Sequence, residues 1–476
     1  MVLEAKPYLR QAFGREEKLY FLKVGCLILV IYFFRREISS LFGFFLMFLP
    51  SLFFAYVWFK SLNTGDRVID VLREHITFIP IPYTEGGGKK FVPRLTILLI
   101  LLNILVFYML ALTTGKQVES VFSHFSFLPE ETTWWNFPLS PFTSMFLHIS
   151  AGHLWGNMVM FWAFGPAVEE RLGAKKFVLL YFATGILGSL ASLVVFRVFM
   201  SSTFHSIGAS GAIAGITGVF LVRCYFKKLV IPLPLFGLVN AKLKVNSLLP
   251  LGAFFLLDIR GGFRQLQGSG SPVAYWVHVG SMATGMLIAA RLKLQKAAAE
   301  EKYTEAGLAA MESQYSRRES VDSLQAALQL NPENEAALLG LAREYAVTRR
   351  PEGRDLFQQA IRLKLRASPE QAAEIYKEYA SAYNLMLEPD LQYRLAGVFY
   401  RQDEHEPAAR LLEMIVLEPS TSDGTRQRAF YQLVILLAEN NMLEAAQYRL
   451  RQFTEQFPGS ELAKAAEDKF VELLKK

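Results

Sequence analysis

Residues 177–196 read FVLLYFATGILGSLASLVVF, which is twenty residues without a charged side chain. A helix needs about 20 mostly apolar residues to cross the hydrocarbon core of a bilayer, so this stretch predicts a membrane-spanning helix. The stretch at 245–263 is weaker, because it contains Pro250 and carries Asp258 and Arg260 near its end. Four further stretches have the same apolar character, at 96–114, 145–164, 207–222 and 273–290. We therefore expect an all-α fold built on a polytopic bundle of six membrane helices.

The loops between these stretches alternate in charge. Lys and Arg cluster after the second, fourth and sixth stretches, whereas residues 117–170 contain neither. Positive charge marks the cytoplasmic side of a membrane protein, so we expect both ends of the six-helix unit to face the cytoplasm. The segment 229–238, which contains Ile231-Pro-Leu-Pro, is expected to be a broken loop before the fifth helix.

The net charge of +7 is the difference between two unlike parts of the chain. Residues 1–300 contain 28 Lys and Arg against 15 Asp and Glu, whereas residues 301–476 contain 22 against 28. The basic excess lies in short runs between apolar stretches, where it sets the orientation of a membrane protein. It therefore does not indicate nucleic-acid binding. The two cysteines, Cys26 and Cys224, lie in or beside apolar runs, which argues against a disulfide scaffold.

The N-terminal region has two apolar stretches, 24–34 and 41–59, separated by Arg35-Arg36-Glu37. A membrane-inserted hairpin over 1–60 is the favoured interpretation, although it places both arginines on the outer side. A single span or a shallow insertion remains open. Residues 61–92, with a Gly86-Gly87-Gly88 run, are then a cytoplasmic connector to the six-helix unit at 93–294.

From residue 295 the composition changes to Ala, Leu, Glu, Gln and Arg with helical periodicity. The segments 321–347, 393–417 and 429–457 each indicate paired amphipathic helices, and prolines follow the last two at Pro419 and Pro458. This pattern resembles tetratricopeptide repeats in architecture, although the spacing is irregular. An ordinary helical bundle is the alternative. We expect residues 295–476 to form a soluble cytoplasmic helical domain, whose stacked helices could bind a protein partner.

Polar groups inside membrane helices are costly, so they are candidates for function. Three groups of residues stand out: His148 and His153 with Asn157, the run Gly208-Ala-Ser210-Gly211, and His278. Each also has a structural interpretation, because small residues let membrane helices pack closely and a lone histidine often only pairs with a neighbour. No Cys, Asp or Glu lies at ligand spacing from the two histidines at 148 and 153, so neither a metal nor a cofactor is expected.

The order of these groups along the chain suits acyl transfer. A serine hydroxyl becomes a nucleophile when a base removes its proton, and the imidazole of His278 can act on Ser210 in this way. His153, the Asn157 amide and the Ser210 backbone N–H could stabilise the oxyanion. No carboxylate is expected beside His278, since Asp258 lies at the outer end of the fifth stretch, so we predict a dyad. Four glycines are expected to let the fourth and sixth helices touch: Gly208, Gly211, Gly280 and Gly285.

These motifs together resemble the rhomboid family of intramembrane serine proteases over about 92–294. They are the run from His148 to Asn157, Glu169-Glu-Arg171-Leu-Gly173, Gly208-Ala-Ser210-Gly211, and His278 with Gly285. The resemblance implies Ser210 as nucleophile, His278 as base, and His153 with Asn157 as oxyanion donors. It also implies a cavity open to the outer side and supporting roles for Gly208, Gly211, Gly285 and His148.

Three features depart from the family pattern. The Trp-Arg pair common in the first outer loop is absent, and Trp134-Trp135-Asn136 is the nearest feature. Ala214 replaces the aromatic residue that often follows the serine by four positions, which leaves open how the His278 ring is stacked. Ser281 stands where glycine is frequent.

The sequence therefore predicts a multi-pass serine endopeptidase of a bacterial inner membrane, with its C-terminal domain in the cytoplasm. Its partners would be the lipid bilayer, transmembrane protein substrates and a protein bound by the C-terminal domain. The alternative is a catalytically silent rhomboid-like protein that binds membrane helices, although silent relatives typically lose one of the four residues that are intact here. A transporter or channel fits less well, because the ionisable groups gather at one membrane face.

Overall fold

The chain divides into two compact units, Met1–Ala298 and Ala299–Lys476. The computed structural model describes residues 83–84, 91–129, 139–199, 206–235, 239–268, 273–312, 316–383 and 385–475, with positions 63, 133 and 137. The predicted hairpin at 1–60 lies outside these residues, as do nearly all of the connector at 61–92 and the segment Trp134–Asn136. The domain limits at 294 and 295 stay predictions.

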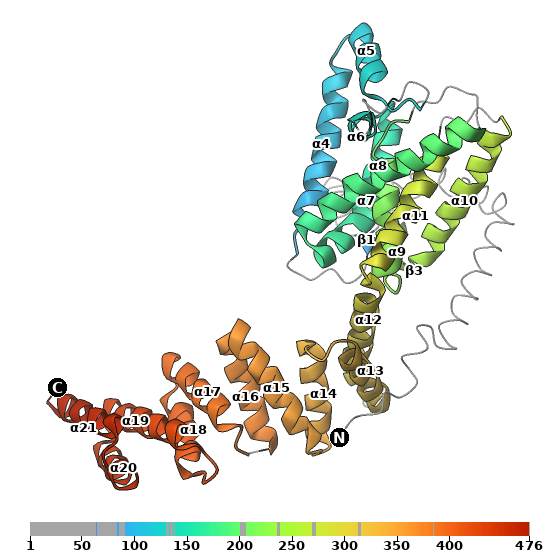
Figure 1. Ribbon diagram of the computed structural model, residues 1–476. Helices are drawn as coiled ribbons and strands as arrows, with labels where there is room; N and C mark the ends of the chain where they lie inside the picture. Colours follow the sequence, from blue (N-terminus) through green and yellow to red (C-terminus); the bar gives the residue numbers. More distant parts are fainter. Residues whose placement is uncertain are drawn as a thin grey trace. The chain divides into compact units, whose positions relative to one another are not determined.

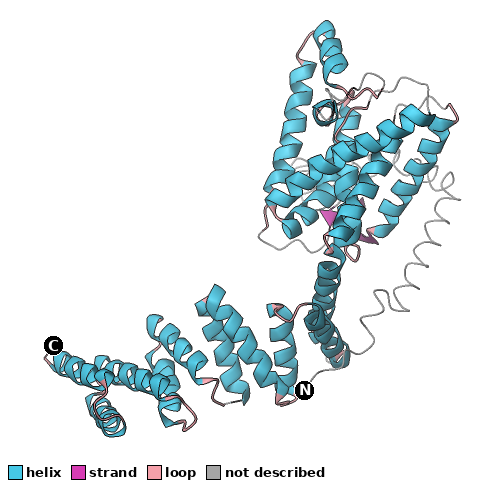
Figure 2. Ribbon diagram, viewed as in Figure 1, coloured by secondary structure: helices cyan, strands magenta, loops and turns pink. Residues whose placement is uncertain are grey.

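The first unit is a helical bundle with a small sheet near one end (Figures 1 and 2). Its described elements are β1 (Tyr83–Thr84), α4 (Arg94–Ala111), α5 (Gly115–Phe125), α6 (Leu139–Ser144), α7 (Ala151–Leu172), α8 (Ala174–Phe199), α9 (Ser210–Arg223), β2 (Lys228–Leu235), β3 (Val239–Asn246), α10 (Leu248–Leu266) and α11 (Tyr275–Arg291). Helices α4 and α8 are by themselves long and apolar enough to cross a membrane, and α9 is a shorter apolar helix. The predicted helical bundle is confirmed.

Helix α9 forms the centre of this bundle. It packs against α7, α8 and α11, and nearly all of its residues are buried. Its 14 residues make it only about 21 Å long, shorter than the roughly 30 Å of a bilayer core. Aromatic side chains fill the space beside it. Phe164 on α7 lies 5.0 Å from Phe220 on α9, and Phe161 lies 6.1 Å from Phe177 and 5.2 Å from Tyr181 on α8, measured between ring centroids.

Helix α7 begins and ends later than predicted, at Ala151–Leu172 instead of 145–164. The Ser150 hydroxyl accepts a hydrogen bond from the backbone N–H of His153 at 3.2 Å, which caps the helix start. Gly173 ends it with a φ of +75°, a conformation that suits glycine. The Glu169–Arg171 run, expected after the helix, therefore lies within its last turn.

This shift of α7 gives Glu169 a structural role. Its buried carboxylate accepts hydrogen bonds from the backbone N–H groups of Leu95 and Thr96, at 2.9 and 2.8 Å, and from the Thr96 hydroxyl at 2.7 Å. The first N–H groups of a helix have no partner within the helix and favour negative charge. Glu169 therefore caps the start of α4 and ties it to α7.

The prediction of a broken loop at 229–238 is wrong for residues 229–235, which belong to β2 in an antiparallel sheet of order β1-β2-β3. Strand β2 pairs with β3 from Lys228–Asn246 to Leu235–Val239, and with β1 at Leu229 and Val230. Pro232 and Pro234 are two residues apart, so their missing N–H groups face the same side of the strand. A strand tolerates proline where the missing N–H would not have donated a hydrogen bond to a neighbouring strand.

The second unit consists of helices that pack in succession. The unit boundary falls within α12 (Leu294–Met311), and the later helices are α13 (Arg317–Leu330), α14 (Glu335–Val347), α15 (Glu352–Ala367), α16 (Pro369–Tyr383), α17 (Pro389–Arg401), α18 (His405–Leu417), α19 (Asp423–Glu439), α20 (Leu443–Gln456) and α21 (Glu461–Leu474). The predicted helices of 321–347 are α13 and α14, and the Asn334 side chain caps α14 by accepting from the Ala337 N–H at 2.9 Å. The repeat family remains a prediction.

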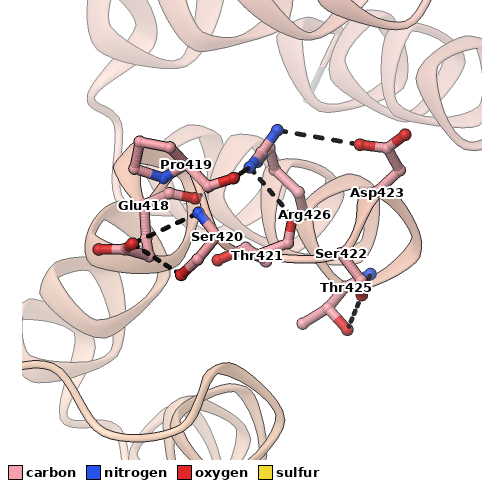
Figure 3. Close-up of polar contacts among 8 residues, drawn as sticks. All are labelled: Glu418, Pro419, Ser420, Thr421, Ser422, Asp423, Thr425 and Arg426. Carbon is pink, nitrogen blue, oxygen red and sulfur yellow. Dashed lines mark hydrogen bonds and ion pairs between the residues drawn. The ribbon is translucent and has the colours of Figure 1, made fainter.

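The turn between α18 and α19 shows how these helices are joined (Figure 3). Helix α18 leaves unpaired carbonyl groups at its end, as every helix does. Arg426 from α19 reaches back and donates to the carbonyl oxygens of Glu418, Pro419 and Thr421, at 2.9, 2.9 and 3.0 Å. One guanidinium group therefore holds the whole turn, and Ser422 begins the next helix as its cap.

Candidate active site

Backbone hydrogen bonds hold the segment that leads into Ser210. Ser206 and Phe127 form an antiparallel bridge, in which the backbone nitrogen of each residue lies 2.9 or 3.1 Å from the carbonyl oxygen of the other. The Gly208 N–H donates to the carbonyl oxygen of Ser144 at 2.9 Å, and its φ of +113° is one that few residues other than glycine adopt. Ser210 is then the first residue of α9, where backbone N–H groups have no partner within the helix.

Ser210 and His278 are brought together from α9 and α11. The Ser210 Oγ lies 2.7 Å from the His278 Nε2. This contact requires the two helices to be close, and glycines allow it: a Cβ at Gly285 would lie 2.1 Å from the Gly215 carbonyl oxygen, and one at Gly211 would lie 2.8 Å from Val277 Cγ1. Small residues let membrane helices approach in this way.

Two of the predicted glycine roles are different in the structure. Gly280 faces α8 and not α9, since a Cβ there would lie 2.8 Å from Ala191 Cβ. Gly208 lies beside α7, because a Cβ at this position would be 2.9 Å from His153 Nε2 and 3.3 Å from Asn157 Nδ2. Gly208 therefore leaves room for the candidate oxyanion donors.

His153 and Asn157 lie on α7 beside the segment that precedes Ser210. The Asn157 Nδ2 is 3.0 Å from the His148 Nε2, so His148 orients the amide. The rings of His148 and His153 meet edge to face, with centroids 5.1 Å apart. The Asn157 amide donates to the His148 Nε2, and His148, His153 and Asn157 form one cluster of nitrogen-containing side chains next to the start of α9.

The prediction that no carboxylate lies beside His278 is wrong. The Asp258 Oδ2, on α10, is 3.0 Å from the His278 Nδ1. Helix α10 continues to Leu266, so Asp258 lies well inside this helix and not at its end. An acidic residue in an apolar span normally has a partner, and this was the signal in the sequence that pointed to a contact.

The ring that stacks on His278 also comes from α10. Phe254 lies with its ring centroid 6.0 Å from the imidazole centroid and its plane tilted by 28°. Ala214 on α9 has no ring that could stack on His278. The stacking ring comes from α10 instead. Sequence reasoning missed Phe254 because nothing in an apolar run distinguishes one phenylalanine from another.

Metal binding has no support in the part of the chain that the structure describes. Those residues contain no group of three or more His, Cys, Asp or Glu side chains placed to hold an ion. The side chains gathered at this site offer hydroxyl, imidazole, carboxyl and amide groups.

Comparison with known proteins identifies the region around the site. Residues 131–295 match the family model described as the Rhomboid domain. The chain is 32% identical over 212 residues to "Rhomboid protease GluP" of Bacillus subtilis, an alignment that covers 44% of this chain and 36% of that protein. It is 40% identical over 78 residues to "Rhomboid protein 1, mitochondrial" of Saccharomyces cerevisiae, covering 16% of this chain and 22% of that protein. The chain thus spans well under half of these relatives.

The helical C-terminal unit has a distant neighbour among solved structures. It is described as "YrrB: a TPR protein with an unusual peptide-binding site", with 20% sequence identity and a TM-score of 0.16, over 37% of this chain and 86% of that chain. This similarity is too low to support an argument. The match to the family model and the named rhomboid proteases among the relatives lead to one conclusion: residues 131–295 of this chain are similar to the Rhomboid domain.

Proposed function

We propose that this protein is an intramembrane serine endopeptidase that cleaves transmembrane segments of other membrane proteins. The observation that carries the proposal is the 2.7 Å contact between the Ser210 Oγ and the His278 Nε2. A serine alone is a weak nucleophile, and an imidazole within hydrogen-bond distance is the group that activates it. The rhomboid domain and its protease relatives support membrane proteins as the class of substrate.

The first half of the reaction forms an acyl-enzyme. As the Ser210 Oγ attacks the carbonyl carbon of the scissile peptide, its proton passes to the His278 Nε2. The carbonyl oxygen becomes negatively charged and needs hydrogen-bond donors. The Asn157 amide, His153 and the unpaired N–H groups at the start of α9 are the candidates near Ser210. The imidazolium then gives its proton to the leaving amine, and the peptide bond breaks.

The second half uses water. A water molecule gives a proton to the His278 Nε2 and attacks the ester carbonyl, so the same donors stabilise a second oxyanion. When this intermediate collapses, the imidazolium returns its proton to the Ser210 Oγ and the acid product leaves. The same base and donors thus serve both halves, and neither half needs a metal or a cofactor.

A fluorophosphonate probe tests this proposal directly. In the purified full-length protein in detergent, we expect the probe to attach to the peptide that contains Ser210, as identified by mass spectrometry. We also expect cleavage of a reconstituted single-span substrate protein. A wild-type protein that is folded but is neither labelled nor active would contradict the proposal and favour the alternative, a silent rhomboid-like protein that binds membrane helices.

Asn157→Ala is expected to reduce turnover without unfolding the protein. The change removes an amide donor that His148 orients, and loss of one oxyanion donor typically lowers kcat by about 10²–10³. The kcat of the purified variant on the reconstituted substrate is the measurement. Asn103→Ala is the matched control, because it removes a buried amide from α4, where the Asn103 Nδ2 donates to the Leu99 carbonyl oxygen. A wild-type kcat in Asn157→Ala would show that Asn157 is not an oxyanion donor.

We further propose that the C-terminal unit lies in the cytoplasm and binds a protein partner. The arrangement of Lys and Arg between the apolar helices supports this orientation. Helices α16, α17 and α18 line an open pocket of about 280 Å³, whose walls include Tyr376, Phe399 and Arg410 and which offers a surface for a peptide side chain. A reporter that works only outside the cytoplasm, fused after Lys476, should be inactive in cells, and an active fusion would reverse the orientation.

A further inference from the structure

The structure places a buried carboxyl group against the histidine of the candidate site. The side chains of Asp258 and His278 are only 7% and 9% exposed, and the Asp258 Oδ2 lies 3.0 Å from the His278 Nδ1. A charged group buried in a membrane bundle is costly unless it is paired and hydrogen-bonded. The imidazole N–H supplies a hydrogen bond that offsets this cost, so Asp258 and His278 depend on each other.

This contact selects one tautomer of the histidine. An ionised carboxylate can only accept hydrogen bonds, so the His278 Nδ1 carries the proton. In a neutral imidazole the other nitrogen then has the free lone pair. That nitrogen, Nε2, is the one 2.7 Å from the Ser210 Oγ, and the serine hydroxyl therefore donates to it. Without the carboxylate, the opposite tautomer becomes accessible, and its Nε2–H cannot take the serine proton.

Helix α10 restrains the same ring from a second side. Phe254 is four residues before Asp258, which places both on one face of α10. The Phe254 ring stacks on the imidazole at 6.0 Å, while the Asp258 carboxyl group holds the ring edge. Trp276 fastens α11 to the same helix, because its Nε1 donates to the Gly262 carbonyl oxygen at 3.2 Å. Helix α10 thus supplies two contacts that orient the His278 ring, in addition to the contact with Ser210 on α9.

We propose that Asp258 is a positioning residue for the general base, so that Ser210, His278 and Asp258 act as a triad in this protein. The inference rests on the proposed serine-protease function. When the imidazole takes the serine proton it becomes positively charged, and the Asp258 carboxylate stabilises that charge.

The test compares Asp258→Asn and Asp258→Ala with the wild-type full-length protein. Loss of the corresponding carboxylate in the Ser-His-Asp template lowers kcat by about 10⁴, and we expect a fall of roughly 10²–10⁴ here with an unchanged KM. Phe254→Leu should lower kcat less. Leu257→Ala, at a neighbouring residue of α10 that is 45% exposed, is the matched control and should keep wild-type kcat. Thermal melting of each variant measures the folded fraction.

Nitrogen NMR of ¹⁵N-histidine-labelled protein reads the tautomer itself, with His278→Gln used to assign the signal. We expect the wild-type signal to show a proton on Nδ1, and Asp258→Ala to lose this preference. Unchanged tautomer and unchanged kcat in the Asp258 variants would overturn the proposal. So would a loss of activity that matches the loss of folded protein while the tautomer stays the same. If the wild type cleaves no substrate but the tautomer still depends on Asp258, the positioning role stands and the protease function fails.

Discussion

Ser210→Ala is expected to abolish cleavage of a reconstituted transmembrane substrate, with a fall in kcat of roughly 10⁶. The change deletes the hydroxyl that forms the acyl-enzyme, and no other serine in the described residues is hydrogen-bonded to His278 Nε2. Folding should be preserved, because the hydroxyl contributes one hydrogen bond and the backbone contacts that place α9 do not involve it. Cleavage rates of purified, reconstituted protein at matched folded concentration are the measurement.

His278→Ala should reduce kcat nearly as much, and the double variant should be no worse than either single one. Mutations of residues that act as a unit have strongly non-additive effects on kcat, because loss of either Ser210 or His278 already prevents the acylation step. Ser189→Ala is the matched control, because it removes a buried hydroxyl that donates to the Gly185 carbonyl oxygen on α8. Undiminished cleavage by Ser210→Ala would rule out the serine-protease function, whereas additive losses would show that the two residues act separately.

Gly285→Ala is expected to disable the enzyme by separating two helices. The added methyl group would lie 2.1 Å from the Gly215 carbonyl oxygen, whereas carbon and oxygen atoms normally stay about 3.3 Å or more apart. Helices α9 and α11 must therefore move apart by roughly 1 Å, and a misplacement of that size can lower a rate about 100-fold. Overpacking of this kind also lowers the free energy of unfolding by about 1–3 kcal/mol.

Cleavage assays and thermal melting in detergent would measure both effects. Gly156→Ala is the matched control, since it adds the same methyl group to a helical glycine of the same bundle, and this methyl group would have no atom of a neighbouring helix or side chain within 4 Å. It should melt at or slightly above the wild-type temperature, because alanine favours a helix more than glycine does. Wild-type activity and melting in Gly285→Ala would show that the α9–α11 contact tolerates separation.

The helical membrane architecture could be predicted from the sequence alone. Residues 177–196 are long and apolar enough to form a span in isolation, and the structure has α8 there at Ala174–Phe199. This succeeds because insertion into lipid depends mainly on the apolarity of one continuous segment. The limits of α7 could not be predicted from apolarity. They depend on the capping hydroxyl of Ser150 and the positive φ of Gly173, and an average over apolar residues contains neither.

The candidate residues Ser210, His278, His153 and Asn157 were also named from the sequence, because polar groups are rare and costly in membrane helices. Their chemical types limited what each could do. The sequence did not contain the distances between them. The 2.7 Å contact between Ser210 and His278 depends on how closely α9 and α11 pack.

The contacts of Asp258 and Phe254 with His278 were decided by the tertiary structure. In the sequence Asp258 lies near the end of its apolar stretch and Phe254 is one of 39 phenylalanines, so neither is marked as a partner of His278. Their contacts with His278 arise from the rotation of α10 about its axis and from its packing against α11. Apolarity is a property of one segment and can be summed along the chain, whereas a hydrogen bond between helices depends on the relative rotation and spacing of two segments, which only their packing sets.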